Sequence, residues 1–118
     1  MSTQTDAEIQ ALLDDLWKRH LPSLIERIST LERAAAEATS GALPETTRAE
    51  AQSVAHKLAG NLGMFGHHEA GEIASRSEQI LKSPTPDTLA ALASLAAQLR
   101  ERLAPHLTPG NEQPATNN

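Results

Sequence analysis

The 118-residue sequence contains no cysteine. This absence excludes disulfide bonds, thiolate metal sites and cysteine nucleophiles, so nucleophilic chemistry must come from histidine, serine, threonine or a carboxylate. Aromatic residues are almost as scarce, because Trp17 and Phe65 stand alone and there is no tyrosine. Alanine and leucine dominate the apolar residues instead, which favours helices and leaves little for β-strands. The sequence predicts an all-α protein.

Basic clusters and long apolar runs are also missing. The ten lysines and arginines are scattered and the net charge is −5, so we expect no nucleic-acid partner and no anionic membrane surface. No run of about 18 apolar residues and no signal-peptide pattern occurs, which predicts a cytoplasmic protein without a membrane segment. A chain of this length forms one modest domain and is too short to include a kinase as well.

Apolar spacing at the start of the chain predicts a short helix followed by a longer one at an angle to it. Thr5 with Glu8 has the pattern of a capping box. Pro22 removes a backbone donor and is expected to kink or restart the helix, which then continues to about Ala38. The first segment has an apolar face that we expect to be buried, formed by Ile9, Leu12, Leu13, Leu16, Trp17 and Leu21.

Three further helices are predicted: from about Pro44 to Leu62, from about residue 70 to Lys82, and from about residue 87 towards Leu107. Between the first two of these, Met64 and Phe65 lie in a glycine-marked turn and are expected to plug the end of the core. Four amphipathic helices with short connections predict an antiparallel up-down-up-down four-helix bundle with a short kinked N-terminal helix. We assign residues 1–107 to this domain and expect residues 108–118 to be a disordered polar tail.

The second of the long helices carries a histidine on a side that packing does not need. Its predicted buried stripe is formed by Ala51, Val54, Ala55, Leu58 and Leu62. At about 100° per residue, His56 lies roughly 140° from the centre of this stripe and Gly60 lies roughly opposite it. An exposed mid-helix glycine costs about 1 kcal/mol relative to alanine. We infer that Gly60 clears room beside the His56 ring for a large partner, and that His56 is a chemical site.

The segment His56-Lys57-Leu58-Ala59-Gly60, followed by Gly63, Phe65 and Gly66, resembles the signature of histidine-containing phosphotransfer (HPt) domains. The resemblance extends from about Pro44 to Lys82, and it implies a four-helix bundle. It also implies that His56 accepts a phosphoryl group from a receiver-domain aspartyl phosphate and passes it to another receiver aspartate. The implied partners are response-regulator receiver domains, with a hybrid sensor kinase as a further candidate.

The chemistry of histidine suits this role. Its unperturbed pKa of about 6.5 leaves a neutral nitrogen nucleophile near physiological pH. Such a transfer requires no bound nucleotide, so we expect no cofactor in this chain, and we expect the Mg²⁺ to belong to the partner receiver domain.

Three charged residues are further candidates under the resemblance. Many members carry lysine three residues after the histidine, where this chain has Ala59, whereas Lys57 directly follows the histidine, where the family often has lysine. Glu78 falls where the family often has a Glu or Gln that faces the histidine; accepting from Nδ1–H would leave Nε2 free to attack. Lys82 either replaces the missing cation or forms an ordinary i,i+4 pair with Glu78.

Other conspicuous residues have structural interpretations. The segment His67-His68-Glu69 superficially suggests a metal site, but neighbouring helix positions point about 100° apart, so we interpret it as a helix start and expect no metal. Trp17 is expected to anchor the first helix, and His106 to lie at an interface or on the surface.

Two alternatives to a phosphorelay carrier are considered. A histidine kinase dimerisation domain typically has an acidic residue after the histidine and a proline shortly downstream, whereas here Lys57 follows and no proline occurs before Pro84. No glycine-rich nucleotide box is present, so autokinase activity is not expected. A phosphorylation-incompetent HPt-like adaptor that only binds a partner stays open. The exposed His56 suggests a monomer.

Overall fold

The computed structural model describes residues 2–107 and the side chains from Thr5 onwards; the predicted tail at 108–118 lies outside this range. Four helices follow one another, α1 (Ser2–Thr39), α2 (Glu45–Met64), α3 (His68–Lys82) and α4 (Pro86–Leu103), and a 3₁₀ turn, η1 (Ala104–His106), comes last. Because no strand occurs in these residues, the prediction of an all-α fold is confirmed. None of the described helices is long and apolar enough to cross a membrane.

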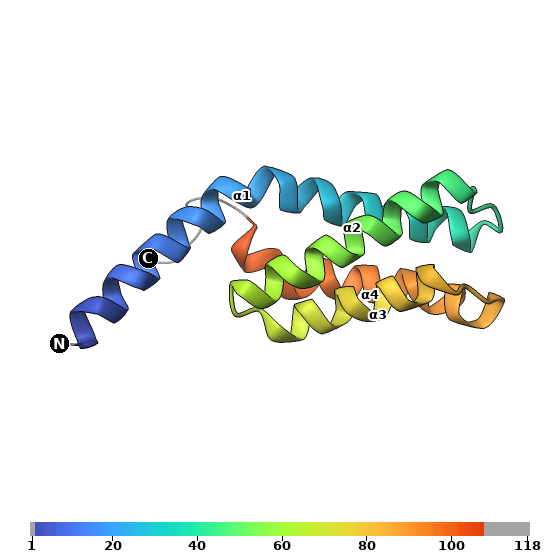
Figure 1. The fold of residues 1–118 in the computed structure, drawn as a ribbon. Coiled ribbons are helices and arrows are strands. Elements are labelled where there is room, and N and C mark those ends of the chain that lie inside the picture. The colour runs from blue at the N-terminus through green and yellow to red at the C-terminus, as the bar shows by residue number, and fades with distance from the viewer. Residues whose placement is uncertain (1, 108–118) are drawn as a thin grey trace.

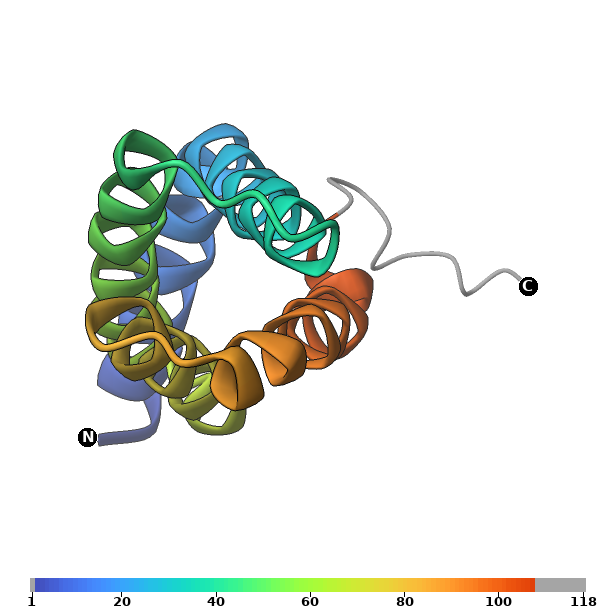
Figure 2. The same ribbon diagram turned by 90° about the vertical axis from the view of Figure 1, so that its right-hand side faces the viewer.

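The four helices form a closed ring around one core, as the end-on view in Figure 2 shows. Each helix packs against its neighbours in the sequence, and α4 closes the ring against α1. Short connections at residues 40–44, 65–67 and 83–85 make successive helices antiparallel. The core consists mainly of fully buried leucine and isoleucine side chains from all four helices, namely Leu24, Ile28, Leu31, Leu58, Leu62, Leu81, Leu92, Leu99 and Leu103.

The first helix is continuous rather than divided. The sequence predicts a kink or a restart at Pro22, and Figure 1 shows that α1 bends in the region of residue 20 without ending. A proline lacks the N–H for the i−4 hydrogen bond and crowds the preceding turn, which bends a helix where it does not break it. The predicted N-cap at Thr5 is wrong, because α1 already begins at Ser2.

The N-terminal arm, defined here as residues 5–20 of α1, projects beyond the end of the bundle (Figure 1). The prediction that its apolar face is buried is wrong for the outer half, because Ile9 is 51% and Leu12 is 58% exposed. Leu13 and Leu16 are half-buried. The reason is geometric: the outer part of the arm extends past the turn that joins α2 and α3, so the bundle covers little of it (Figure 1).

The connection between α2 and α3 sets the register of these two helices. Gly66 has a φ of +87°, a left-handed conformation that glycine adopts without a steric penalty. This lets the N–H of His67 donate to the carbonyl of Leu62 at 2.8 Å and closes the end of α2. Met64 is 58% exposed, so the prediction that it plugs the core is wrong.

At the base of the arm, aromatic and imidazole rings from three parts of the chain meet in what we call the Trp17 cluster, formed by Trp17, His20, Phe65, His67 and His106. The Trp17 ring centroid lies 5.1 Å from that of Phe65 and 4.7 Å from that of His67. The indole Nε1–H donates to the carbonyl of His106 at 2.8 Å. These contacts tie α1 to the α2–α3 turn and to η1, so Trp17 anchors the first helix.

Candidate functional site

The second helix has two faces of opposite character. Ala51, Ala55, Leu58 and Leu62 are completely buried and form its core-facing stripe. The side chain of His56 is 75% exposed. This imidazole therefore lies on the solvent side of α2, in the middle of the helix and away from its ends.

One ring nitrogen of His56 has a fixed partner. His56 Nδ1 lies 3.0 Å from Glu78 Oε2, and the Glu78 side chain is only 14% exposed. An ionised carboxylate only accepts hydrogen bonds, so Nδ1–H donates and the neutral ring carries its lone pair on Nε2. The pair spans α2 and α3, and the turn at Gly66 brings the two residues opposite each other. The open nitrogen, Nε2, is on the solvent side of an oriented ring.

The surface next to the imidazole is bare. Gly60 is exposed on α2 one turn after His56, and a Cβ at this position would meet no atom within 4 Å. The same holds for Gly63. Packing inside the chain therefore does not require a glycine at either position, although glycine lowers the stability of a helix.

A third glycine, Gly71 on α3, lies at the contact between α2 and α3, which was not predicted from the sequence. It is buried, and a Cβ built on it would lie 3.5 Å from the carbonyl oxygen of Ala59 and 3.6 Å from the backbone nitrogen of Gly63. These are ordinary van der Waals distances, so α2 and α3 are in packing contact at Gly71, and the contact would accommodate an alanine. The burial of its neighbours Ala70 and Ala74 follows from their spacing, but a glycine at such a contact has no distinctive local pattern.

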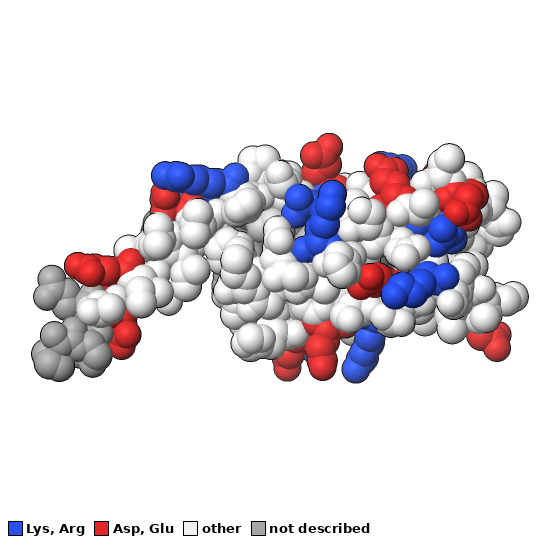
Figure 3. All heavy atoms as spheres, viewed as in Figure 1, with Lys and Arg blue, Asp and Glu red and all other residues white. Residues whose placement is uncertain are grey.

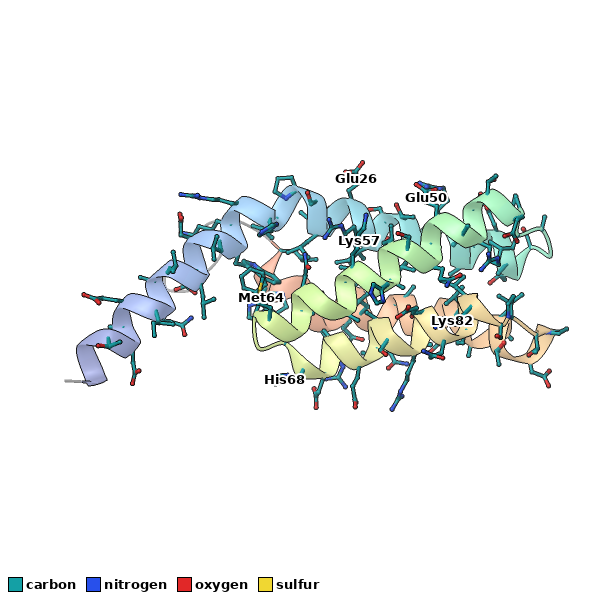
Figure 4. The ribbon with its side chains drawn as sticks, in the orientation of Figure 1. Glu26, Glu50, Lys57, Met64, His68 and Lys82 are labelled. Carbon is teal, nitrogen blue, oxygen red and sulfur yellow. The ribbon has the colours of Figure 1, made fainter. Side chains whose placement is uncertain are left out.

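Cations flank the exposed face of α2 on both sides, as Figures 3 and 4 show. Lys57 is exposed on α2, and Lys82 is exposed at the end of α3. In the described part of the chain Lys82 makes no ion pair with Glu78, whose carboxylate lies against His56 instead. Neither lysine touches the imidazole in any interaction found among residues 5–107.

A third cation near this face was not identified from the sequence. With its amide turned so that the nitrogen donates to the carbonyl of Lys57 (3.2 Å), the Asn61 side chain accepts through its oxygen from Arg27 Nη1 (2.9 Å). Arg27 lies on α1, so its guanidinium is brought to α2 by helix packing alone. Only the tertiary structure places Arg27 beside Asn61, since the two residues are far apart in the chain.

Gln52, one turn before His56, has a structural partner. Its Oε1 accepts from Arg48 Nη1 at 2.6 Å, and the same nitrogen donates to the carbonyl of Leu81 at 2.7 Å. The Arg48 side chain therefore ties α2 to the end of α3. This contact holds the two helices together on the side of His56 away from the turn.

The other histidines lie in different surroundings. His67 precedes α3 and His68 begins it, in keeping with their interpretation as a helix start. Burial lowers the pKa of His67 below its ordinary value, and the neighbouring His106 and His68 lower this pKa further. Within residues 5–107, no three His, Asp or Glu side chains are placed to hold a metal ion together.

The fold and this site together define a small helical bundle with one oriented, solvent-exposed histidine on its second helix. The sequence profile of the Hpt domain matches residues 15–104, well over half of the chain. The chain therefore belongs to the Hpt family, the histidine-containing phosphotransfer domains of two-component phosphorelays.

A curated relative agrees with this assignment. Protein RcaC of Microchaete diplosiphon is 34% identical over 68 residues, which make up 58% of this chain and 10% of that protein. The chain thus spans only about a tenth of the length of this relative. No solved structure matches the chain significantly.

Proposed function

We propose that this protein is a phosphorelay intermediate that accepts a phosphoryl group on His56 from a receiver-domain aspartyl phosphate and passes it to a second receiver. The observation that carries the proposal is the His56–Glu78 contact, in which Nδ1 is held at 3.0 Å while the ring stays 75% exposed. Histidine phosphotransfer is the activity of the family. We also propose that the phosphoryl group moves from one receiver to another through this protein, and that the protein is cytoplasmic.

The transfer step follows from this arrangement. The lone pair on Nε2 attacks the phosphorus of the aspartyl phosphate; a P–N bond forms as the P–O bond to the carboxylate breaks, and the free aspartate leaves. The Nδ1 proton stays between His56 and Glu78, whose negative charge stabilises the ring as it becomes cationic. Glu78 is thus a positioning residue. The receiver supplies the Mg²⁺ that neutralises the phosphoryl oxygens.

Docking is assigned to the exposed face of α2. The bare backbone at Gly60 lets a receiver approach the imidazole, and the exposed Met64 offers an apolar contact further along the same helix. Lys57 and Arg27 lie on the α1 side of this face and Lys82 on the α3 side, which suits the acidic site of a receiver and its phosphoryl group. These cations take the place of the lysine that many members carry where this chain has Ala59.

Two other functions lead to different expectations. A phosphorylation-incompetent adaptor needs neither a free Nε2 nor a carboxylate at Nδ1, and the contact between His56 and Glu78 favours the carrier instead. An autokinase needs a nucleotide site, and we propose none in this chain. Incubation with ATP and Mg²⁺ alone should leave the protein unlabelled.

The proposal is tested by incubating a panel of receivers, charged with a small phosphodonor, with this protein. The expected product is an acid-labile, base-stable phosphoprotein that His56→Gln eliminates without changing the helix content. Transfer of the group from the labelled protein to a second, uncharged receiver would establish the relay. If receivers bind but no label reaches the wild type, the adaptor function is correct.

Gly60 provides a separate test of docking. Because a Cβ there meets nothing, Gly60→Ala should stabilise the bundle by up to about 1 kcal/mol, while Gly60→Lys should slow transfer by obstructing the receiver. The matched control is Ala93→Lys on the exposed side of α4, which should leave the transfer rate unchanged. Unfolding of Gly60→Lys would show that this face is not free.

A further inference from the structure

The guanidinium group of Arg48 on α2 reaches across to the end of α3. Its Nη1 donates to the carbonyl of Leu81 at 2.7 Å and to Gln52 Oε1 at 2.6 Å. The other edge of the same group forms a fork with the Glu45 carboxylate, at 2.9 Å from Nε and 2.7 Å from Nη2. The contacts with Glu45 and Gln52, both on α2, fix the direction of the Arg48 side chain, so that its remaining N–H is aimed at α3.

The carbonyl that Arg48 reaches has no donor within its own helix. An α-helix leaves its last four carbonyls without an intrahelical partner, and α3 ends at Lys82. The N–H of Thr85, four residues after Leu81, donates to Thr88 Oγ1 in the capping box of α4 instead. Arg48 supplies the missing donor to the Leu81 carbonyl, and it places a positive charge at the end of a helix where a cation is favourable.

The turn that Arg48 caps is the turn that carries Glu78. In an α-helix each N–H bonds to the carbonyl four residues earlier, so the last turn of α3 closes from Lys82 back onto Glu78. Helix ends fray where their terminal groups lack partners. Arg48 therefore stabilises a turn whose first residue has its carboxylate 3.0 Å from His56 Nδ1.

Arg48, Gln52 and His56 form one row along α2, at intervals of four residues, on the side that faces α3. On this side Arg48 contacts Leu81 and His56 contacts Glu78. Near the turn that joins them, α2 and α3 are in direct packing contact, whereas Figure 1 shows the two helices farther apart towards their other ends. The long side chain of Arg48 spans this wider part.

We propose that Arg48 is a positioning residue for phosphotransfer, which holds the last turn of α3 so that the Glu78 carboxylate stays at Nδ1 of His56. This inference rests on the proposed function of His56. Among the contacts found in residues 5–107, Arg48 does not touch the imidazole, so it acts through α3 and Glu78. Without Arg48, a looser Glu78 lowers the share of rings that carry Nδ1–H, and with it the share whose Nε2 is free to attack.

The first experiment compares Arg48→Met with wild type in the full chain, without a receiver. Exchange of the Lys82 and Ser83 amide protons should accelerate about threefold, the lower part of the range expected for loss of one hydrogen bond. At about pH 8.5, where an unperturbed histidine is neutral, ¹⁵N NMR should show a smaller share of the Nδ1–H tautomer at His56. Arg48→Lys keeps a donor and a positive charge near the end of α3, so both values should lie between those of wild type and Arg48→Met.

Arg100→Met is the matched control, because Arg100 also joins two helices through its guanidinium group. Arg100 on α4 forms a fork with Glu32 on α1, at 2.9 Å from Nε and 2.8 Å from Nη2. Its replacement removes an interhelical contact of the same kind outside the α2–α3 pair. The variant should lose stability but leave the exchange of the Lys82 amide and the tautomer of His56 unchanged. These two measurements therefore separate positioning of Glu78 from a general loss of stability.

The second experiment is a double-mutant cycle on the rate of phosphoryl transfer from a charged receiver. Arg48→Met alone should slow transfer about threefold, again the lower part of the range for one hydrogen bond. In the Glu78→Ala background the same substitution should cause no further slowing, because the residue through which Arg48 acts is already absent.

Three results would overturn the proposal. The first is a His56 tautomer ratio that Arg48→Met leaves unchanged. The second is an equal slowing by Arg48→Met with and without Glu78, and the third is a tautomer change in Arg100→Met as large as that in Arg48→Met. Each of them would limit Arg48 to a structural role. If no receiver phosphorylates the wild type, the proposed function of His56 fails, while amide exchange and the tautomer ratio still decide whether Arg48 positions Glu78.

Discussion

Two imidazoles, His56 and His67, show how one residue type is used for different purposes in the same small bundle. His56 is largely exposed, and its Nδ1 is held by the carboxylate of Glu78. His67 is half-buried, with its ring centroid 4.7 Å from that of Trp17 and 4.8 Å from that of His106. The first has a charged partner and an open nitrogen, whereas the second has ring neighbours and a lowered pKa.

The two environments suit different uses of an imidazole: a carboxylate partner with an exposed ring suits chemistry, and ring packing suits a structural contact. A carboxylate at Nδ1 fixes one tautomer and stabilises the charge that develops during attack, while exposure leaves room for a partner. Ring packing instead favours the neutral imidazole and encloses it. The lowered pKa of His67 accompanies burial and ring packing, so a perturbed pKa does not by itself mark a histidine for chemistry.

The largest expected effect comes from exchanging the two histidines for glutamine one at a time. His56→Gln should lose all phosphohistidine while its free energy of unfolding stays within about 0.5 kcal/mol of wild type, because the side chain is exposed. His67→Gln should keep transfer and lower stability. Phosphotransfer assays and urea denaturation measure both quantities. Loss of transfer in both variants would mean that the two sites are not independent.

Removal of the Nδ1 partner should have the next largest effect. Glu78→Ala should slow transfer about tenfold, by analogy with partners that orient metal-ligating histidines, and ¹⁵N NMR should show a smaller share of the Nδ1–H tautomer at His56. Glu78→Gln retains an acceptor and should be slowed less. An unchanged tautomer ratio in Glu78→Ala would remove Glu78 from the mechanism.

Disruption of the Trp17 cluster should lower the stability of the protein and leave phosphotransfer unchanged. Trp17→Ala removes the ring contacts and the Nε1–H bond to His106, and should lower the free energy of unfolding by about 2 kcal/mol. Leu12→Ala on the exposed arm is the matched control, expected within about 0.5 kcal/mol of wild type. Phosphotransfer by the folded Trp17→Ala protein should be unchanged.

The smallest effect is a dependence of stability on pH. Since the pKa of His67 is lower in the folded protein, the unfolded chain binds its proton first as the pH falls. The contribution of neutral His67 should be complete above about pH 6.5 and disappear as the pH falls below that value towards the folded-state pKa. Urea denaturation of wild type and His67→Gln at several pH values isolates the contribution of His67 to the pH dependence of the free energy of unfolding. The same pH dependence in both proteins would contradict a lowered pKa of His67 in the folded state.

Local sequence was sufficient to predict which side chains of α2 are buried and which are exposed. The stripe of buried residues on α2 and the exposure of His56 follow from helical periodicity, because a helix fixes which side chains share a face. The pairing with Glu78 is predicted only through the family resemblance, since no local rule gives the register between two helices. Gly66 explains that register once the turn is seen.

What the amino-acid sequence determined by itself is the set of helices, their apolar faces and the histidine that is left outside them, because these depend on interactions within one or two turns. The tertiary structure alone decided which apolar faces have a partner. It exposed Ile9, Leu12 and Met64, brought Arg27 to α2, and joined Trp17 to His106 across most of the chain. The physical reason is that burial depends on where other helices end in space, and periodicity within one helix carries no information about that.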